Sequence, residues 1–263
     1  MFKQNRVEKA QEAYRKNDLN ATKRAHTKKA IEHKEKHQKE KGKYIGDLVY
    51  GALDGIVTTF AVVSGVQGAQ MSNSVVLIMG FANLLADGIS MGLGNYLSLK
   101  SELEYIKKER ERETWEIEHY PEGERKEIRY IFKKKRFKGK DLDRAVKVIT
   151  SDKKVWVETM MLDELGLTSE DKTPVFSGLA TFLAFLVAGF IPLIIFVISF
   201  FIPLVSTNLF AVSIFLTALT LFSVGAMRSF ITGTNWIRSG LEMLLVGGLA
   251  ATVAYWIGFF LRR

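Results

Sequence analysis

Apolar and charged residues are segregated along this chain into long alternating stretches. Residues 44–98 and 174–261 are almost free of charge, whereas residues 1–43 and 100–173 are dense in charged side chains. A soluble fold intermixes the two kinds of residue, so this segregation indicates a membrane protein with a large polar insert. The mean hydropathy is near zero because it averages over both kinds of segment.

Five apolar segments are long enough to cross a membrane as helices, since about 20 apolar residues span the hydrocarbon core. Only a few residues join the first two segments, which predicts a tight hairpin. The fold class expected is therefore an all-α integral membrane protein with five transmembrane helices. These helices are expected at about 44–70, 74–99, 175–201, 208–227 and 239–261.

Helical signals continue into the polar insert. The second span runs without a break into Ser101–Tyr120, which is charged and strongly helical. Pro121-Glu122-Gly123 is expected to interrupt this helix, which resumes over 124–135. The insert is therefore expected to be helical throughout and to begin as an extension of the second span.

Capping residues mark two further helices of the insert. Asp141 is expected to cap a helix over 142–150, and Asp152 a second one that ends at Gly166. The domain division expected is a basic arm (1–43), spans one and two (44–99), a helical metal-binding domain (100–173) and spans three to five (174–263).

The distribution of charge predicts the orientation. The net charge of +9 arises mainly from residues 1–43, which hold 14 Lys and Arg against 6 Asp and Glu, while residues 100–173 hold 19 against 18. Five spans put the two ends of the chain on opposite sides, so the arm, the insert and the 228–238 loop share one side. By the positive-inside rule that side is cytoplasmic, with Arg262 and Arg263 as a minor exception.

Several protein classes are excluded by what the sequence lacks. Without cysteine there are no disulfides or thiolate sites, so a metal must be held by oxygen, imidazole or thioether. The N-terminus does not resemble a cleaved signal peptide, and the basic arm lacks the aromatics and motifs of a nucleic-acid partner. It is expected to lie near anionic lipid, with His26, His33 and His37 solvated. No P-loop is present, which argues against an ATP-driven pump.

The polar residues within the first two spans require a structural or functional explanation, because placing a charge at mid-bilayer costs a few kcal/mol. The first span contains Asp47 and Asp54, and the second contains Asn83, Asp87 and Met91. A carboxylate beside a thioether suits a first-row divalent ion better than Mg²⁺ or Ca²⁺. We therefore expect these five residues to line a transport pathway, although protonated or helix-bonded carboxylates remain an alternative.

That alternative applies equally to Asp47 and to Glu242, which lie near the ends of their helices. Glycine pairs at small-xxx-small spacing, Gly51 with Gly55 and Gly88 with Gly92, flank the polar positions. Such pairs let helix backbones approach closely. They fit either packing between spans one and two or a dimer interface that brings two copies of Asp54 together.

The insert carries glutamates at helical spacing. Glu113 and Glu116 share one helix face, and Glu124 and Glu127 repeat this spacing after the Pro-Gly break. Two helices folded back on each other would place four carboxylates together, where a cation or protons must neutralise them. Nearby basic residues on a solvated face would neutralise these carboxylates equally well; they are Arg110, Arg112 and Lys126.

Met160, Met161 and Glu164 follow on one turn of a later helix, and thioethers beside a carboxylate again suggest a transition metal. The two methionines could equally pack the core of the insert. An enzyme also has to be considered, because Glu116-x-x-His119 occurs in di-iron carboxylate oxidases. That site needs a second Glu-x-x-His copy, which the sequence lacks, so we expect no enzyme.

Three stretches together resemble the vacuolar iron transporter family. They are Tyr50-Gly-Ala-Leu-Asp-Gly-Ile-Val-Thr-Thr-Phe60, Ala86-Asp-Gly-Ile-Ser-Met91-Gly and the start of the insert at Tyr96-Leu-Ser. The Met-Met-x-x-Glu end of the insert makes the match more specific. The resemblance covers roughly residues 44–261 and leaves the role of the basic arm open.

The resemblance implies a homodimer with five spans per chain that exports cytosolic iron(II), or a similar divalent ion, by proton antiport. Two alternatives to transport of this kind remain, a membrane-bound di-iron carboxylate oxidase, which is the weaker hypothesis, and a passive divalent cation channel. The implied path includes Asp54 and Met91, and the ion is cargo, with no prosthetic group. The implied metal ligands of the insert are Glu113, Glu116, Glu124, Glu127, Met160, Met161 and Glu164. The sequence does not rank iron against manganese, cobalt or zinc. The lack of cysteine and of targeting features favours a prokaryotic plasma membrane, or the vacuolar membrane in a eukaryote.

Overall fold

The computed structural model describes residues 10, 12–14, 16–26, 43–168, 172–202 and 208–262. Within these residues the chain is helical and contains no strand, as the fold class predicts. Most of the basic arm, with His33 and His37, lies outside the described residues. Its described part includes α2 (Leu19–Ala25), which Asp18 caps by accepting hydrogen bonds from the backbone N–H groups of Asn20 and Ala21.

Five helices are long and apolar enough to cross a membrane, which confirms the prediction of five spans. The third is interrupted by a 3₁₀ turn, η2 (Ile191–Leu193), at Pro192, because proline cannot donate the helical hydrogen bond. The fourth and fifth spans extend further toward the loop between them than the hydropathy pattern indicated. The spans are α5 (Ile45–Gly68), the first part of α6 (Asn73–His119), α10 (Pro174–Phe190) with α11 (Ile194–Phe201), α12 (Leu209–Thr232) and α13 (Trp236–Leu261).

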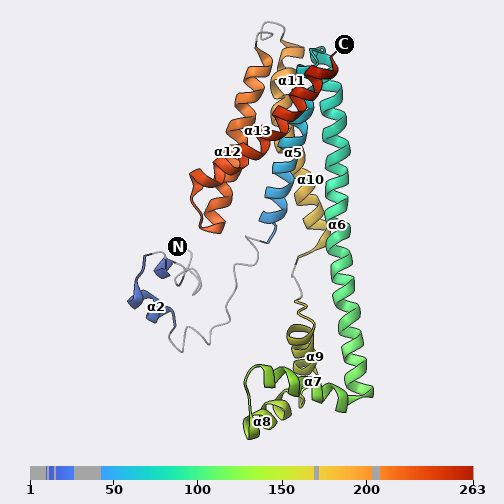
Figure 1. Ribbon diagram of the computed structural model, residues 1–263, viewed down its shortest axis with the longest axis vertical. Helices are drawn as coiled ribbons and strands as arrows, with labels where there is room; N and C mark the ends of the chain where they lie inside the picture. Colours follow the sequence, from blue (N-terminus) through green and yellow to red (C-terminus); the bar gives the residue numbers. More distant parts are fainter. Residues whose placement is uncertain are drawn as a thin grey trace.

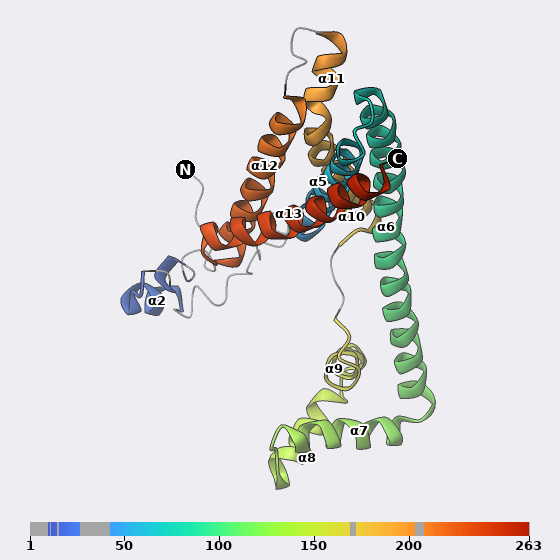
Figure 2. The ribbon, with the colours of Figure 1, turned by 45° about the horizontal axis from the view of Figure 1, so that its top comes forward.

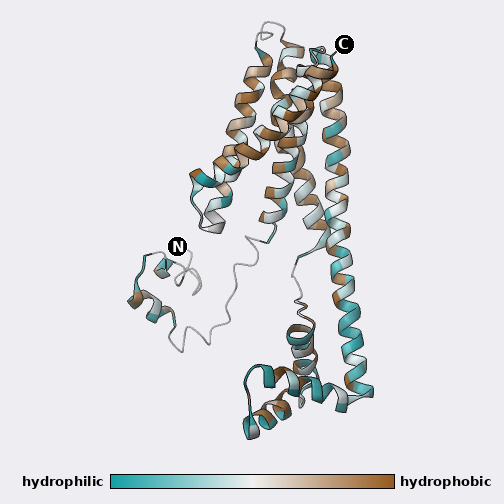
Figure 3. Ribbon diagram, in the orientation of Figure 1, coloured by the Kyte–Doolittle hydropathy of each residue, from teal (hydrophilic) through white to brown (hydrophobic). Residues whose placement is uncertain are grey.

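Helix α5 lies in the middle of the bundle and packs against α10, α13, α6 and α12 (Figure 1). Helix α6 continues far beyond the bundle as one unbroken helix, as the sequence predicts, and carries the insert at its end. In the second view the insert again stands clear of the bundle (Figure 2). Hydropathy follows this division, with apolar residues on the bundle and hydrophilic residues on the lower part of α6 and on the insert (Figure 3).

The insert consists of α7 (Pro121–Lys134), α8 (Gly139–Ile149), α9 (Lys153–Thr159) and a π-helical turn, η1 (Met160–Glu164). Two boundaries correct the expectations. Pro121 begins α7 instead of preceding it, because proline fits the first helical position, where no donor is needed. Lys138 is the N-cap of α8, so Asp141 lies inside its first turn and does not cap it.

The other capping predictions for the insert are confirmed. The side chain of Asp152 accepts hydrogen bonds from the backbone N–H groups of Lys154 and Val155 and so caps α9. Gly166 adopts a left-handed conformation, φ +67°, just after the helical segment ends. The insert is thus held by a local core in which Ile128, Ile131 and Trp156 are buried together.

The glycine pairs of spans one and two pack against the third span of the same chain. A Cβ atom added at Gly51 would lie 2.3 Å from the carbonyl oxygen of Thr181 on α10, and one at Gly55 would lie 2.4 Å from that of Phe185. On α6, Gly88 and Gly92 likewise face α10. The close approach therefore joins α5 and α6 to α10 of the same chain, which is the intramolecular packing that the spacing allowed, with the third span as the facing helix.

Candidate functional site

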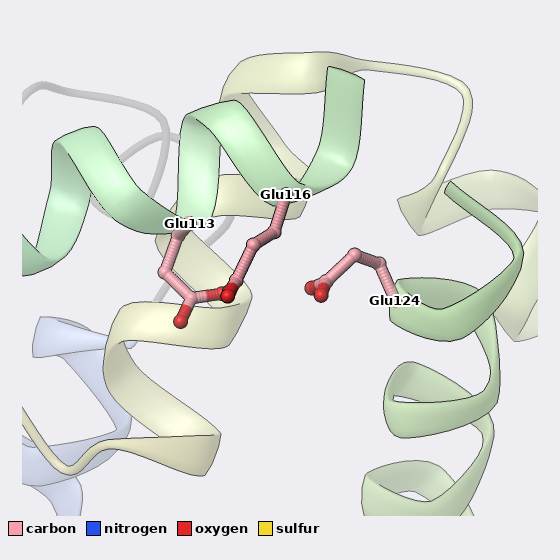
Figure 4. A group of neighbouring side chains, drawn as sticks. All are labelled: Glu113, Glu116 and Glu124. Atoms are coloured by element: carbon pink, nitrogen blue, oxygen red, sulfur yellow. The ribbon is translucent and has the colours of Figure 1, made fainter. Parts of the chain in front are cut away.

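Three glutamates of the insert bring their carboxylates together. Glu113 and Glu116 project from one face of α6, and Glu124 projects toward them from the first turn of α7 (Figure 4). One carboxylate oxygen from each residue lies within 4.8 Å of the other two. The chain turn at Tyr120, φ −138°, separates the two helices and directs α7 back toward the acidic face of α6. The spacing had predicted this convergence.

The cluster is buried on one side, and some of its carboxylate oxygens lack hydrogen-bond partners among the described residues. Glu113 is 1% exposed and Glu124 is 5% exposed. Arg112 lies between the acids, with guanidinium nitrogens 2.6 Å from Glu113 and 2.5 Å from Glu116. The contact to Glu113 lacks hydrogen-bond geometry, so both oxygens of Glu113, like Oε2 of Glu124, have no hydrogen-bond partner among the described residues. Buried oxygens of this kind require a proton or a cation.

Burial raises the pKa of these glutamates. The pKa of Glu113 rises to about 7 through desolvation, although the charge of Arg112 opposes the shift. The pKa of Glu124 also rises to about 7, first through desolvation and then through the nearby charge of Glu127. The pKa of Glu164, whose side chain is exposed but whose carboxyl group is partly desolvated, is raised first by that desolvation and then by the charge of Glu127. At neutral pH these carboxyl groups are therefore close to their midpoint of protonation, and a divalent ion bound here would compete with the protons.

The remaining expected insert ligands surround the three central acids. Glu127 and Glu164 are exposed and act electrostatically on the central acids, so they lie at the rim. Met160 and Met161 are 0% and 1% exposed and belong to the hydrophobic core of the insert. These two methionines and Glu164 lie in the π-helical turn, where the N–H of Leu165 donates to the carbonyl of Met160 at 3.2 Å. Such turns are frequent at functional sites.

His119 is not part of the acidic cluster. Its Nδ1 lies 2.8 Å from the carbonyl oxygen of Trp115, and its ring stacks on that of Trp115 at 4.3 Å between centroids. Among the described residues, only Glu113, Glu116 and Glu124 form a group with metal-binding spacing, and it contains no histidine. The Glu116-x-x-His119 spacing thus does not assemble into the arrangement that a di-iron oxidase requires.

A second polar group lies within the bundle at the end that faces the insert. Asn95 on α6 donates to Asp47 on α5 at 3.2 Å and to Thr181 on α10 at 2.7 Å. Ser177 on α10 donates to the other oxygen of Asp47 at 2.8 Å. Asp47 therefore links three helices. Its position allowed two roles, pathway lining or bonding between helices, and these contacts support the second.

The other residues expected along the pathway lie deeper on the facing helices α5 and α6. Asp54 and Asp87 are half-buried and close enough to interact electrostatically. Asn83 lies one turn of α6 before Asp87, and its Nδ2 has no hydrogen-bond partner among the described residues. Met91 lies one turn after Asp87 and packs against the core of the bundle. Glu242 lies elsewhere, 3.4 Å from both Arg228 and Arg238.

Asn95, Ser177 and Thr181 are the polar residues of this region that the sequence interpretation missed. A signal for Asn95 was present, because it continues the four-residue spacing of Asn83, Asp87 and Met91 along one face of the helix. Ser177 and Thr181 gave no comparable signal, since hydroxyl groups are common in membrane helices and bond their own backbone.

Comparison with named proteins shows which class of membrane protein this chain belongs to. A protein of Toxoplasma gondii named vacuolar iron transporter is 38% identical over 97% of this chain and 88% of its own length. The vacuolar iron transporter of Plasmodium falciparum is 36% identical, with 97% and 96% covered. Vacuolar iron transporter 1 of Arabidopsis thaliana is 34% identical, with 85% and 88% covered. With its five spans, the chain is thus an integral membrane transporter and not an enzyme.

The family itself follows from a match that covers most of the chain. Residues 45–259 match the VIT family, from the start of α5 nearly to the end of α13. The chain belongs to the VIT family. The similarity to the Toxoplasma gondii protein extends well into the basic arm, because it covers 97% of this chain. The arm is therefore shared with some of its relatives.

Proposed function

We propose that this protein exports iron(II) from the cytosol in exchange for protons. The observation that carries the proposal is the buried cluster of Glu113, Glu116 and Glu124 in a chain of the VIT family. The relatives described above are named as iron transporters. Carboxylate and thioether donors also accept manganese, cobalt and zinc, so these ions are proposed as secondary cargo.

The insert is the proposed loading site on the cytosolic side. Its central glutamates lie between exposed acids at the rim, Glu127 and Glu164, and buried oxygens that lack partners. The rim attracts the hydrated ion, and the inner oxygens replace part of its water shell. Met160 and Met161 are proposed as soft ligands that become available when the π-helical turn rearranges, because thioethers favour transition metals over Mg²⁺ and Ca²⁺.

The bundle supplies the proposed path between α5 and α6. The ion passes Asp47 near the insert end and then meets Asp54, Asp87 and Met91 deeper in the helices. Asn83 offers an amide further along the same face of α6. Asp54 and Asp87 are half-exposed in a single chain. Carboxylates avoid lipid, so we propose that a second copy covers this face in a homodimer.

Protons from the far side complete the cycle. A protonated carboxylic acid is less costly to bury than its anion and binds metal poorly. Protons that reach Asp54 and Asp87 therefore release the ion and return to the cytosol as these groups deprotonate. The names of the relatives favour a vacuolar membrane over the prokaryotic plasma membrane expected from the sequence alone.

Two variants separate the path from the loading site. In vesicles containing the purified protein, Asp54→Ala is expected to abolish iron(II) uptake. Glu113→Ala is expected to raise the iron concentration that gives half-maximal uptake while leaving most of the maximal rate. Glu111→Ala serves as the matched control, because Glu111 is an exposed residue of α6 outside the cluster. Equal uptake by Asp54→Ala and the unmodified protein would contradict the assigned path.

A further inference from the structure

A hollow lies between the end of α7 and α8. These helices form the end of the insert that is remote from the bundle (Figure 1). The volume of the hollow is about 670 Å³, within the range of ligand-binding cavities. Phe132, Phe137, Val148 and Ile149 supply its apolar lining. The hollow is separate from the carboxylate cluster, since none of its lining residues belongs to that cluster.

Basic side chains surround this apolar lining. The segment 133–140 contains 6 Lys and Arg and no acid, and Arg144 follows on α8. Arg136, Lys138 and Arg144 line the hollow, where Asp141 is the single acid among the lining residues. Its rim therefore attracts anions, in contrast to the acidic cluster at the other end of α7.

Two other basic residues, one on α7 and one just after it, are paired with acids. Arg129 lies 2.5 Å from Asp143, and Lys135 lies 2.5 Å from Asp163. By contrast, within the described part of the chain no carboxylate lies at ion-pair distance from Arg136, Lys138 or Arg144. Three exposed cations held together without counter-charges are a surface suited to an acidic ligand.

The backbone fixes the position of one of these cations. Arg136 has φ +73°, in the left-handed region, and its N–H donates to the carbonyl of Lys133 while the N–H of Phe137 donates to that of Phe132. This is the C-terminal motif in which helices usually carry glycine, because other residues are strained there. The arginine is thus held at the rim of the hollow by a rigid turn.

The apolar lining is open to solvent. Val148 is 60% exposed and Phe137 is 39% exposed, although both lie within a ring of cations. A ligand with only negative charge would leave these surfaces uncovered. The ligand that fits best combines one apolar side chain with acidic neighbours.

We propose that this hollow binds an acidic segment of another protein. One apolar side chain of the segment rests on Phe137 and Val148, and flanking carboxylates pair with Arg136, Lys138 and Arg144. This end of the insert stands clear of the membrane-spanning bundle (Figure 2). The chain's own arm is repelled, since it holds 14 basic against 6 acidic residues. The partner therefore comes from the aqueous phase.

The test uses the full-length protein in detergent and a fluorescent polyglutamate peptide with one central leucine, followed by anisotropy. The triple variant Arg136→Gln, Lys138→Gln, Arg144→Gln is expected to weaken binding about tenfold and to reduce its salt dependence. Val148→Asn is expected to weaken binding while leaving the salt dependence unchanged. The matched control replaces Lys108, Lys126 and Lys154, three exposed lysines outside the hollow and outside the 133–140 segment, with glutamine and is expected to bind nearly normally.

Four outcomes would overturn the proposal. The first is that the unmodified protein does not bind the peptide, and the second is that the control triple variant weakens binding as much as the test triple variant does. The third is that a peptide without leucine binds with the same affinity. The fourth is that polyphosphate binds more tightly than the peptide and that Val148→Asn does not change its affinity. Self-association of the protein through this surface, abolished by the triple variant, would instead assign the hollow to a second copy and would equally refute the proposal. None of these readouts depends on metal transport.

Discussion

Asn95 on α6 donates a hydrogen bond to Asp47 on α5 across 48 residues of the chain, at 3.2 Å. The same amide reaches Thr181 on α10, so a single side chain ties together the three helices that adjoin the insert. A polar contact between helices in lipid is worth about 1 kcal/mol. The pair therefore fixes the end of the bundle through which an ion from the insert would enter.

Removal of the Asn95 amide is expected to destabilise this end of the bundle. In Asn95→Ala, Asp47 and Thr181 each lose one hydrogen-bond donor, so the free energy of unfolding should fall by about 1–2 kcal/mol. Thermal unfolding in detergent measures this as a lower Tm. Asn95→Asp is a control of similar size that removes the donor, and it should be at least as unstable. An unchanged Tm for both variants would remove the network's structural role.

The contact between α5 and α10 predicts a strong effect at Gly51. A Cβ atom in Gly51→Ala would lie 2.3 Å from a backbone oxygen of α10, which cannot move without separating the helices. We expect a loss of about 2–3 kcal/mol in the free energy of unfolding. Gly46→Ala is the matched control on the same helix, because nothing lies within 4 Å of its added Cβ. Equal stability of the two variants would show that α10 does not pack as described.

Metal binding by the insert is expected to depend on pH. The pKa values of Glu113 and Glu124 are both about 7, so these carboxylates are protonated below that pH and free to bind metal above it. Affinity for Mn²⁺, measured by calorimetry on the full-length protein, should rise steeply between about pH 6 and 8. The double variant Glu113→Gln, Glu124→Gln should bind weakly at every pH. A profile centred near the ordinary glutamate pKa would contradict the effect of burial.

The same pKa values predict that, without metal, the insert is less stable at higher pH. Glu113 has a pKa of about 7 in the fold against 4.5 when unperturbed, so the folded state holds its proton more tightly. The stability that the protonated Glu113 contributes to the folded state is complete below about pH 4.5 and is lost as the pH rises through 7. Hydrogen exchange at the junction of α6 and α7, corrected for the intrinsic rate, should show declining protection over this range. Divalent metal should restore it, and rising protection without metal would reverse the assignment.

The sequence predicted features that depend on local pattern. The five spans follow from hydropathy, and the convergence of Glu113, Glu116 and Glu124 follows from helical spacing and one chain turn. The partner of the glycine pairs was not predictable in this way, because helical spacing shows that a close approach occurs but does not identify the facing helix. The same limit hid the contact of Asn95 with Thr181, which are far apart in the sequence.

Local capping was predicted less evenly. Asp152 caps its helix as expected, whereas Asp141 does not, because α8 already begins at Gly139, two residues before Asp141. The π-helical turn at Met160–Glu164 also gave no signal, since its residues are good helix formers. Met160 and Met161 of this turn are buried in the core of the insert.

Iron(II) uptake into vesicles with an acidic interior, with simultaneous recording of the internal pH, tests the central claim most directly. The protein must be oriented with the insert outside. The account predicts that iron enters faster with an acidic interior than without a gradient, that the lumen becomes more alkaline as it enters, and that Asp54→Ala abolishes both signals. Uptake that is indifferent to the gradient and leaves the internal pH unchanged would contradict antiport and indicate a passive channel.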